Sequence, residues 1–160
     1  MDNTRLATIL SIAALAIAVV AFVQGRGQKV PEAYVPGLGE IMTLQQMRHA
    51  KLALAGGMAN WQLADYETDE LNEGFEDMVK FHPTHEKVPK PLTELVPQYV
   101  DGPVKDLRAA IEAKDTAKFD AAFDALTAGC NGCHEAANFK FNRVIRPTAP
   151  PVPNQDFRPN

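Results

Sequence analysis

The sequence predicts an all-α protein, a bundle of four helices preceded by one N-terminal transmembrane helix. Three observations support this. An apolar stretch without charge lies near the N-terminus, apolar residues recur at helical spacing in four later segments, and no segment alternates as a β-strand does. Helices joined by short connections pack as bundles. The length of 160 residues fits one such domain with appendages.

The N-terminal apolar stretch covers residues 6–25 and consists mainly of Leu, Ile, Ala, Val and Phe. A helix of about 20 residues is about 30 Å long, which matches the hydrocarbon core of a bilayer. A cleaved signal segment is the alternative, but its apolar core is shorter, about 7 to 15 residues. We therefore expect residues 1–26 to be a membrane anchor, with a signal segment as the alternative.

Glycine and proline are frequent in residues 27–37, which predicts a linker. The first helix of the bundle is expected over residues 38–57, where the chain reaches two consecutive glycines. Its apolar stripe, read at 100° per residue, includes Met42 and His49. A histidine on such a stripe is either a hydrogen-bonded core residue or a ligand.

Asn60 is the predicted N-cap of a second helix that ends near residue 81, where Pro83 follows. The acidic residues of this helix fall mostly on its polar face, and residues 82–91 are expected to form a loop. A third helical region follows, which we expect Pro97 and the sequence at 101–103 to interrupt. Its clearer part is residues 104–113.

Asp115 or Thr116 is expected to cap the fourth helix, whose stripe contains Cys130, Cys133 and His134. The bundle should therefore cover residues 38–146. Beyond it, residues 147–160 hold five prolines and are predicted to be an extended tail outside the core.

The composition excludes some classes of function. The formal net charge is −4, whereas binding to nucleic acid needs a basic surface. The two cysteines are only three residues apart, so they do not form the disulfide framework of a small secreted protein.

The run Cys130-Asn131-Gly132-Cys133-His134 has the Cys-x-x-Cys-His pattern by which c-type haem is attached. Two thiols one helical turn apart reach the two vinyl groups of a porphyrin, and His134 shares the face of Cys130, which places an imidazole under the iron. A thioredoxin-like redox pair would need an α/β context, and a zinc site would need a second pair of ligands. The sequence therefore predicts one covalent haem c, with His134 as the proximal iron ligand.

A helical bundle whose haem motif lies in its last helix resembles the class II c-type cytochromes, the cytochrome c′ group. The resemblance covers residues 38–146 and depends on Cys130, Cys133 and His134. It implies an antiparallel four-helix bundle, haem between the first and fourth helices, and often a homodimer. The group includes five-coordinate members that bind small gases and six-coordinate electron carriers in which a first-helix residue, commonly Met, is the distal ligand. The predicted anchor, the tail and the first-helix histidine depart from the pattern.

His49 is the candidate distal iron ligand, and Met42 is the weaker alternative. Met47 points away from the stripe, and His82 and His85 flank a proline in a loop where we expect them to be solvated. A haem iron without a protein ligand on this side is a further alternative. Five basic side chains could bind the haem propionates, form a rim for docking, or simply be solvated: Arg48, Lys51, Lys140, Arg143 and Arg146.

Together these features predict a membrane-anchored monohaem cytochrome that carries single electrons between periplasmic or membrane redox partner proteins and is not an enzyme. Haem c is attached outside the cytoplasm, so we expect a single-pass protein of the cell membrane with its haem domain on the periplasmic side. One alternative is a five-coordinate protein that binds or senses gases. Another is an accessory subunit of a larger respiratory or photosynthetic complex.

Overall fold

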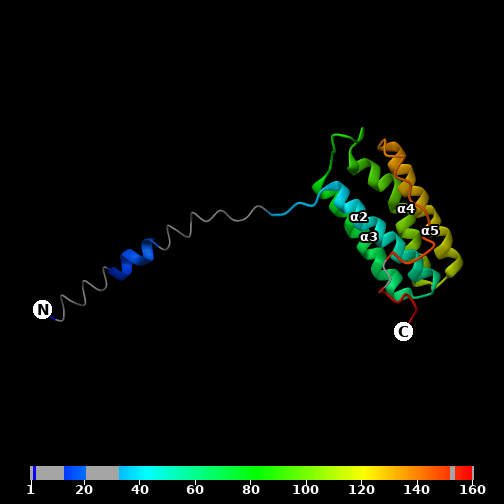
Figure 1. Ribbon diagram of the computed structural model, residues 1–160, viewed down its shortest axis with the longest axis horizontal. Helices are drawn as coiled ribbons and strands as arrows, with labels where there is room; N and C mark the ends of the chain where they lie inside the picture. The colour runs from blue at the N-terminus through cyan, green and yellow to red at the C-terminus, as the bar shows by residue number, and fades with distance from the viewer. Residues whose placement is uncertain (1, 3–12, 21–32, 152–153, 160) are drawn as a thin grey trace. The chain divides into compact units, whose positions relative to one another are not determined.

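The computed structural model describes residues 2, 13–20, 33–151 and 154–159. The chain divides into two units, Met1–Tyr34 and Val35–Asn160. In the first unit residues 13–20 are helical (Figure 1). These residues and residue 2 are the described part of the predicted anchor, and its other residues lie outside the described ranges. Within the described ranges, no helix is both long enough and apolar enough to cross a membrane.

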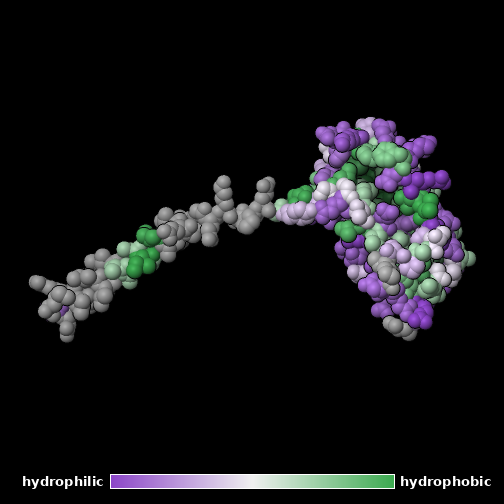
Figure 2. Space-filling view, viewed as in Figure 1, coloured by the Kyte–Doolittle hydropathy of each residue, from purple (hydrophilic) through white to green (hydrophobic). Residues whose placement is uncertain are grey.

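The second unit is a bundle of four helices, α2 (Leu38–Gly57), α3 (Trp61–Phe81), α4 (Leu92–Glu112) and α5 (Thr116–Ala136). Helix α2 packs on α3, α3 on α4, and α4 on α5, while α2 and α5 close the ring (Figure 1). The described residues contain no β-strand. Polar side chains cover much of the visible face of this unit (Figure 2). The predicted all-α helical bundle is confirmed.

Side-chain caps fix where two of these helices begin. The Asn60 side chain accepts a hydrogen bond from the Leu63 amide, and the Asp115 side chain accepts one from the Lys118 amide. Both caps satisfy an amide that has no partner within its own helix. The predicted cap at Asn60 is confirmed, and of the two alternatives for α5 the structure uses Asp115.

Helix α4 continues through Pro97 and Pro103, so the predicted interruption is wrong. Proline has no amide hydrogen, so the carbonyl group four residues before Pro103, that of Tyr99, receives no helical hydrogen bond from it. This carbonyl lies against Gly129 of α5, where the absence of a side chain lets the two helices approach closely. Burial of the apolar stripe of α4 against its neighbours outweighs the local cost of the prolines.

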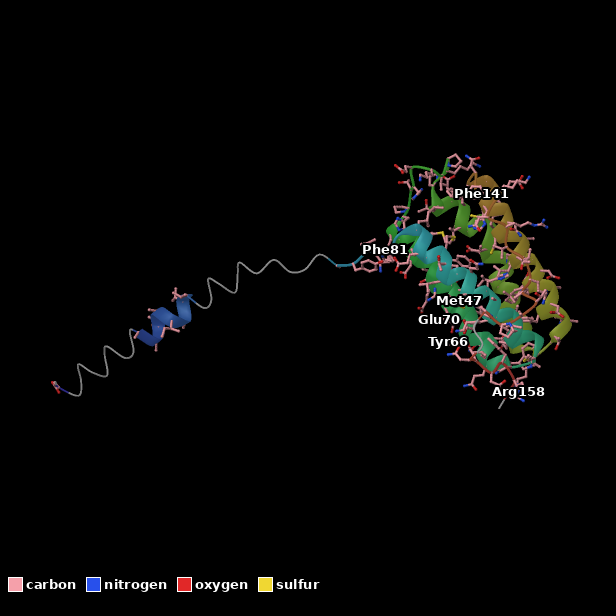
Figure 3. All side chains as sticks on the ribbon, in the orientation of Figure 1. Met47, Tyr66, Glu70, Phe81, Phe141 and Arg158 are labelled. Atoms are coloured by element: carbon pink, nitrogen blue, oxygen red, sulfur yellow. The ribbon has the colours of Figure 1, made fainter. Side chains whose placement is uncertain are left out.

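The C-terminal tail folds back onto the bundle, and this corrects the expectation that it lies outside the core. Phe157 is only 2% exposed and belongs to the hydrophobic core. Beside it, the Asn60 side chain donates a hydrogen bond to the carbonyl of Arg158, which lies at the end of the bundle where α2 meets α3 (Figure 3). Although the tail is rich in proline, the burial of Phe157 and this hydrogen bond hold it against the bundle.

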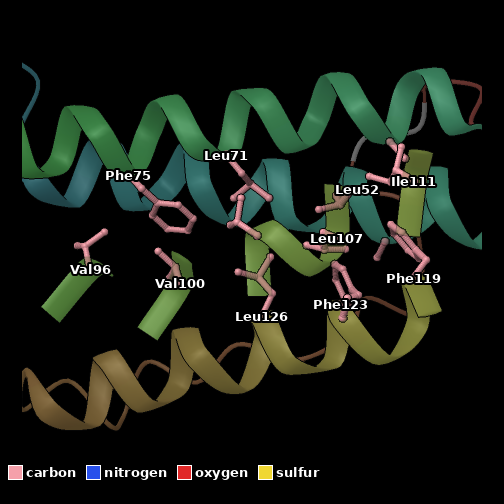
Figure 4. Packing of buried hydrophobic residues seen from close by; sticks show 14 of the residues in the cluster. Leu52, Leu71, Phe75, Val96, Val100, Leu107, Ile111, Phe119, Phe123 and Leu126 are labelled. Atoms are coloured by element: carbon pink, nitrogen blue, oxygen red, sulfur yellow. The ribbon is translucent and has the colours of Figure 1, made fainter. Parts of the chain in front are cut away.

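The core fills the space between the four helices along their length (Figure 4). The ring of Phe119 packs where α2 has Gly56, since a side chain on that residue would collide with the ring. Farther along α5, Phe123 contacts His49 of α2, so α2 and α5 run antiparallel. The largest fully buried apolar side chains are those of Leu52, Leu71, Leu95, Leu107, Phe119, Phe123 and Leu126.

Candidate functional site

A cavity of about 250 Å³ brings together all five residues that the sequence singles out, namely Met42, His49, Cys130, Cys133 and His134. Met42 and His49 reach it from α2, and the motif reaches it from α5. Apolar side chains of α3 and α4 form much of the remaining wall, among them Leu71, Phe75, Met78, Val96 and Val100. The spacing of the apolar stripes therefore predicted which residues lie together.

A second cavity of about 320 Å³ lies next to the first one. The two cavities share Met42, Cys133 and His134 among their lining residues. The second cavity extends toward the loop between α3 and α4, where it is lined by His85 and Val88. The space beside the motif is thus larger than either cavity alone.

The two cysteines are half-buried free thiols one turn apart on α5. Burial raises the pKa of the Cys130 thiol to about 12, and the nearby Cys133 contributes to the rise. Burial also raises the pKa of Cys133. Both side chains are therefore neutral thiols at neutral pH, and both line the apolar cavity.

The imidazole of His134 is held by the backbone beyond α5. Its Nδ1 lies 2.6 Å from the carbonyl oxygen of Asn142. Because a carbonyl can only accept, Nδ1 carries a hydrogen, which leaves the Nε2 atom as the one that can bind a metal in the neutral imidazole. Histidines that bind metals are commonly fixed in this tautomer by such a hydrogen bond. The hydrogen bond to Asn142 therefore gives His134 the orientation that an iron ligand would need.

Residues 138–147, which we call the strap, form one wall of the first cavity. Asn142, Arg143, Val144, Ile145 and Pro147 all line it. The strap begins where Asn138 leaves α5 with a positive φ of 67°, a conformation that asparagine tolerates better than most residues. Sequence reasoning missed the strap because it has no helical or strand period.

Asn131 and Gly132, the two residues between the cysteines, contact the strap and helix α4. Asn131 Nδ2 donates to the carbonyl of Val144 at 2.9 Å, and the Val144 amide donates to Asn131 Oδ1 at 2.8 Å. Gly132 lies under the ring of Tyr99, whose Cε1 would be 2.7 Å from an added side-chain carbon. Asn131 therefore binds the strap, and Gly132 leaves room for the ring of Tyr99.

His49 is buried, with 4% of its surface exposed. Its Nε2 lies 2.8 Å from Thr127 Oγ1, and the Thr127 hydroxyl donates its one hydrogen to the carbonyl of Phe123 at 2.9 Å. The hydroxyl must therefore accept from Nε2–H of His49. His49 thus both borders the cavity and is hydrogen-bonded in the core, so both readings of this residue remain open.

The other side chains considered as distal ligands lie in different surroundings. Met42 lines both cavities, whereas Met47 is 36% exposed on the outer side of α2 (Figure 3). His82 is half-buried, and its Nε2 donates a hydrogen bond to the carbonyl oxygen of Pro36 at 2.8 Å. His85 is half-buried and lines the second cavity. Both loop histidines were expected to be solvated, and the structure shows them only partly exposed.

Four of the five basic side chains proposed for haem propionates are held in ion pairs. Arg143 is the one that lines the first cavity. The ion pairs join Arg48 to Glu70, Lys51 to Glu67, Lys140 to Glu135, and Arg146 to Asp120 and Asp124.

We predict that the haem-free chain loses stability as the pH falls from 6.5 to 4. Burial lowers the pKa of His49 from 6.5 to about 4, and the positive charge of Arg146 lowers it further. The unfolded chain therefore takes up a proton that the folded chain refuses in this interval. The stabilisation is complete above pH 6.5, and about 3 kcal/mol of it is lost by pH 4. Urea unfolding measured across this range tests it.

The control for this prediction is His49→Leu, which removes the titrating group. The variant's free energy of unfolding should depend less steeply on pH between 6.5 and 4. An identical pH profile in the variant would show that other groups cause the loss.

Among the residues that the structure describes, no group of three or more His, Cys, Asp or Glu side chains could hold a metal ion. Comparison with protein-family models, with curated proteins and with solved structures finds no match to this chain. Two neutral thiols, an imidazole with a free Nε2 and an apolar cavity between α2 and α5 fit a covalently attached haem.

Proposed function

We propose that this chain is a membrane-anchored monohaem c-type cytochrome of the class II type, which carries single electrons between redox partners on the periplasmic side. The observation that supports it most is the cavity that gathers Cys130, Cys133 and His134 opposite His49. The two thiols and His134 would hold the haem. When bound, the haem supplies an iron that takes up and releases one electron.

The two cysteines are suited to the attachment step. Each thiol would add across the double bond of one vinyl group, so that its sulfur would bond to one carbon and its hydrogen would go to the other. No atom leaves, and no oxidant or reductant is consumed. The 130–133 spacing puts both sulfurs on one side of α5, facing the cavity.

The residues around the cavity suit electron transfer better than bond chemistry. His134 is fixed by the strap, and His49 is buried and neutral because burial lowers its pKa to about 4. A neutral imidazole can bind iron, so His49 is the proposed distal ligand, with Met42 as the alternative. Ligation by two histidines gives a lower reduction potential than ligation by histidine and methionine.

One observation favours a second candidate function. The hydrogen bond from His49 Nε2 to Thr127 Oγ1 occupies the atom that would bind iron. If this bond persists in the loaded protein, the distal position stays free for a small gas molecule. The protein would then be a five-coordinate gas-binding cytochrome.

The test of the proposed function is to produce the full chain in bacteria with a haem c maturation system. We expect the purified protein to carry the extra mass of one haem after denaturation, and to be recovered with the membranes. The double variant Cys130→Ser/Cys133→Ser should lose the covalent haem while its helical circular dichroism persists. A wild-type chain recovered without covalent haem would overturn the proposal.

A further inference from the structure

We propose that Asn131 is a positioning residue for the proximal histidine. It fixes the strap so that the carbonyl group of Asn142 holds Nδ1 of His134. The proposal extends the proposed function, since it assigns His134 the role of iron ligand.

The strap folds back onto the last turn of α5, where His134 lies. The amide of Phe139 donates to the carbonyl of His134 at 2.7 Å, and the amide of Asn142 donates to the carbonyl of Phe139 at 2.8 Å. The carbonyl of Asn142 then accepts from Nδ1 of His134 at 2.6 Å. These three hydrogen bonds form a closed circuit that begins and ends on His134.

The side chain of Asn131 joins the strap to α5 at a second point, Val144. Its side-chain amide donates to the Val144 carbonyl at 2.9 Å and accepts from the Val144 amide at 2.8 Å. The same Nδ2 also donates to the carbonyl of Thr127 at 3.0 Å. Val144 is two residues after Asn142, so fixing its backbone fixes the carbonyl that faces His134. Asn131 itself lines neither cavity, and it therefore acts through the strap.

A second attachment lies farther along. The guanidinium of Arg146 contacts Asp120 and Asp124 and lies 4.7 Å from the centre of the Phe123 ring. The carboxylates of Asp120 and Asp124 on α5 and the guanidinium of Arg146 are all partly exposed, so solvent weakens these ion pairs. The half-buried pair between Asn131 and Val144 is closer to Asn142 along the chain and controls its position more directly.

The hydrogen bond on Nδ1 should affect the reduction potential of the iron. A histidine that donates its Nδ1 hydrogen to a carbonyl is a more basic ligand, which favours the oxidised iron. Loss of the strap should free Nδ1 and raise the reduction potential. The same loss should free the backbone of the strap, so that trypsin cleaves faster after Lys140 and Arg143, whose side chains are already exposed.

The test compares Asn131→Ala and Asn131→Asp with the control Asn72→Ala, which removes an exposed side-chain amide that donates to Glu76 one turn along α3, far in sequence from the strap. In the full chain before haem is loaded, we expect Asn131→Ala to speed trypsin cleavage after Lys140 and Arg143. We also expect an NMR signal of the Nδ1 hydrogen of His134 in the wild type and its loss in Asn131→Ala. In the loaded protein its reduction potential should rise. Asn131→Asp keeps the acceptor for the Val144 amide but loses both donors, so its effects should be intermediate.

Each outcome decides a different point. If Asn131→Ala matches wild type in cleavage and in the Nδ1 signal, the strap is not held by Asn131 and the inference is wrong. If cleavage speeds up but the Nδ1 signal and the potential stay unchanged, Asn131 is merely structural, which also overturns it. Failure of the wild-type chain to bind haem covalently would instead refute the proposed function, and the two haem-free measurements would still decide the position of the strap.

Discussion

Replacing Gly129 by alanine should lower the free energy of unfolding by about 3 kcal/mol. A side-chain carbon on Gly129 would overlap the carbonyl oxygen of Tyr99, which belongs to the backbone and cannot rotate away. Helices α4 and α5 would have to separate next to Cys130. We therefore also expect a smaller yield of covalent haem. Urea unfolding of the haem-free chain measures the first effect, and the haem content of the purified protein measures the second.

Gly57→Ala is the matched control, because an added carbon on this helical glycine meets nothing within 4 Å. Alanine has the higher helix propensity, so this variant should be unchanged or more stable by up to about 1 kcal/mol. Equal stability of Gly129→Ala and wild type would contradict the close approach of the two helices.

The four helices could be predicted because their apolar residues recur with a period that burial against neighbours requires. Asn60 and Asp115 were recognisable as caps because their partners lie three residues away. The continuity of α4 was not predictable in the same way. The prolines are visible in the sequence, but what offsets them is the packing of α4 on its neighbours, including a glycine of another helix.

The tail and the strap show the same limit. A proline-rich composition predicts extended chain, yet Phe157 is buried because the end of the bundle offers it a site. The partner of Asn131 is thirteen residues away in a segment without periodicity. The gathering of Met42, His49 and the motif around one cavity followed from stripes on two helices. The bond between His49 and Thr127 did not, since it depends on the register of α2 against α5.

Replacing His49 by alanine should convert a low-spin haem spectrum into a high-spin one, provided that His49 is the distal ligand. Loss of one imidazole leaves the iron with His134 alone, and carbon monoxide should then bind rapidly to the reduced protein. Met42→Leu serves as the matched control on the same stripe of α2, and it should leave the spectrum unchanged. A low-spin spectrum that survives in His49→Ala but is lost in Met42→Leu would assign the distal position to Met42 instead.

Thr127→Val separates the two readings of His49, because the Thr127 hydroxyl competes with the iron for Nε2. If His49 binds the iron, the hydrogen bond is already broken in the loaded protein, so valine should leave the low-spin spectrum intact. If His49 is a core residue, valine leaves its buried N–H without an acceptor and should cost about 1–3 kcal/mol in the loaded protein as well. A high-spin wild-type protein that loses this stability in Thr127→Val would favour the gas-binding function.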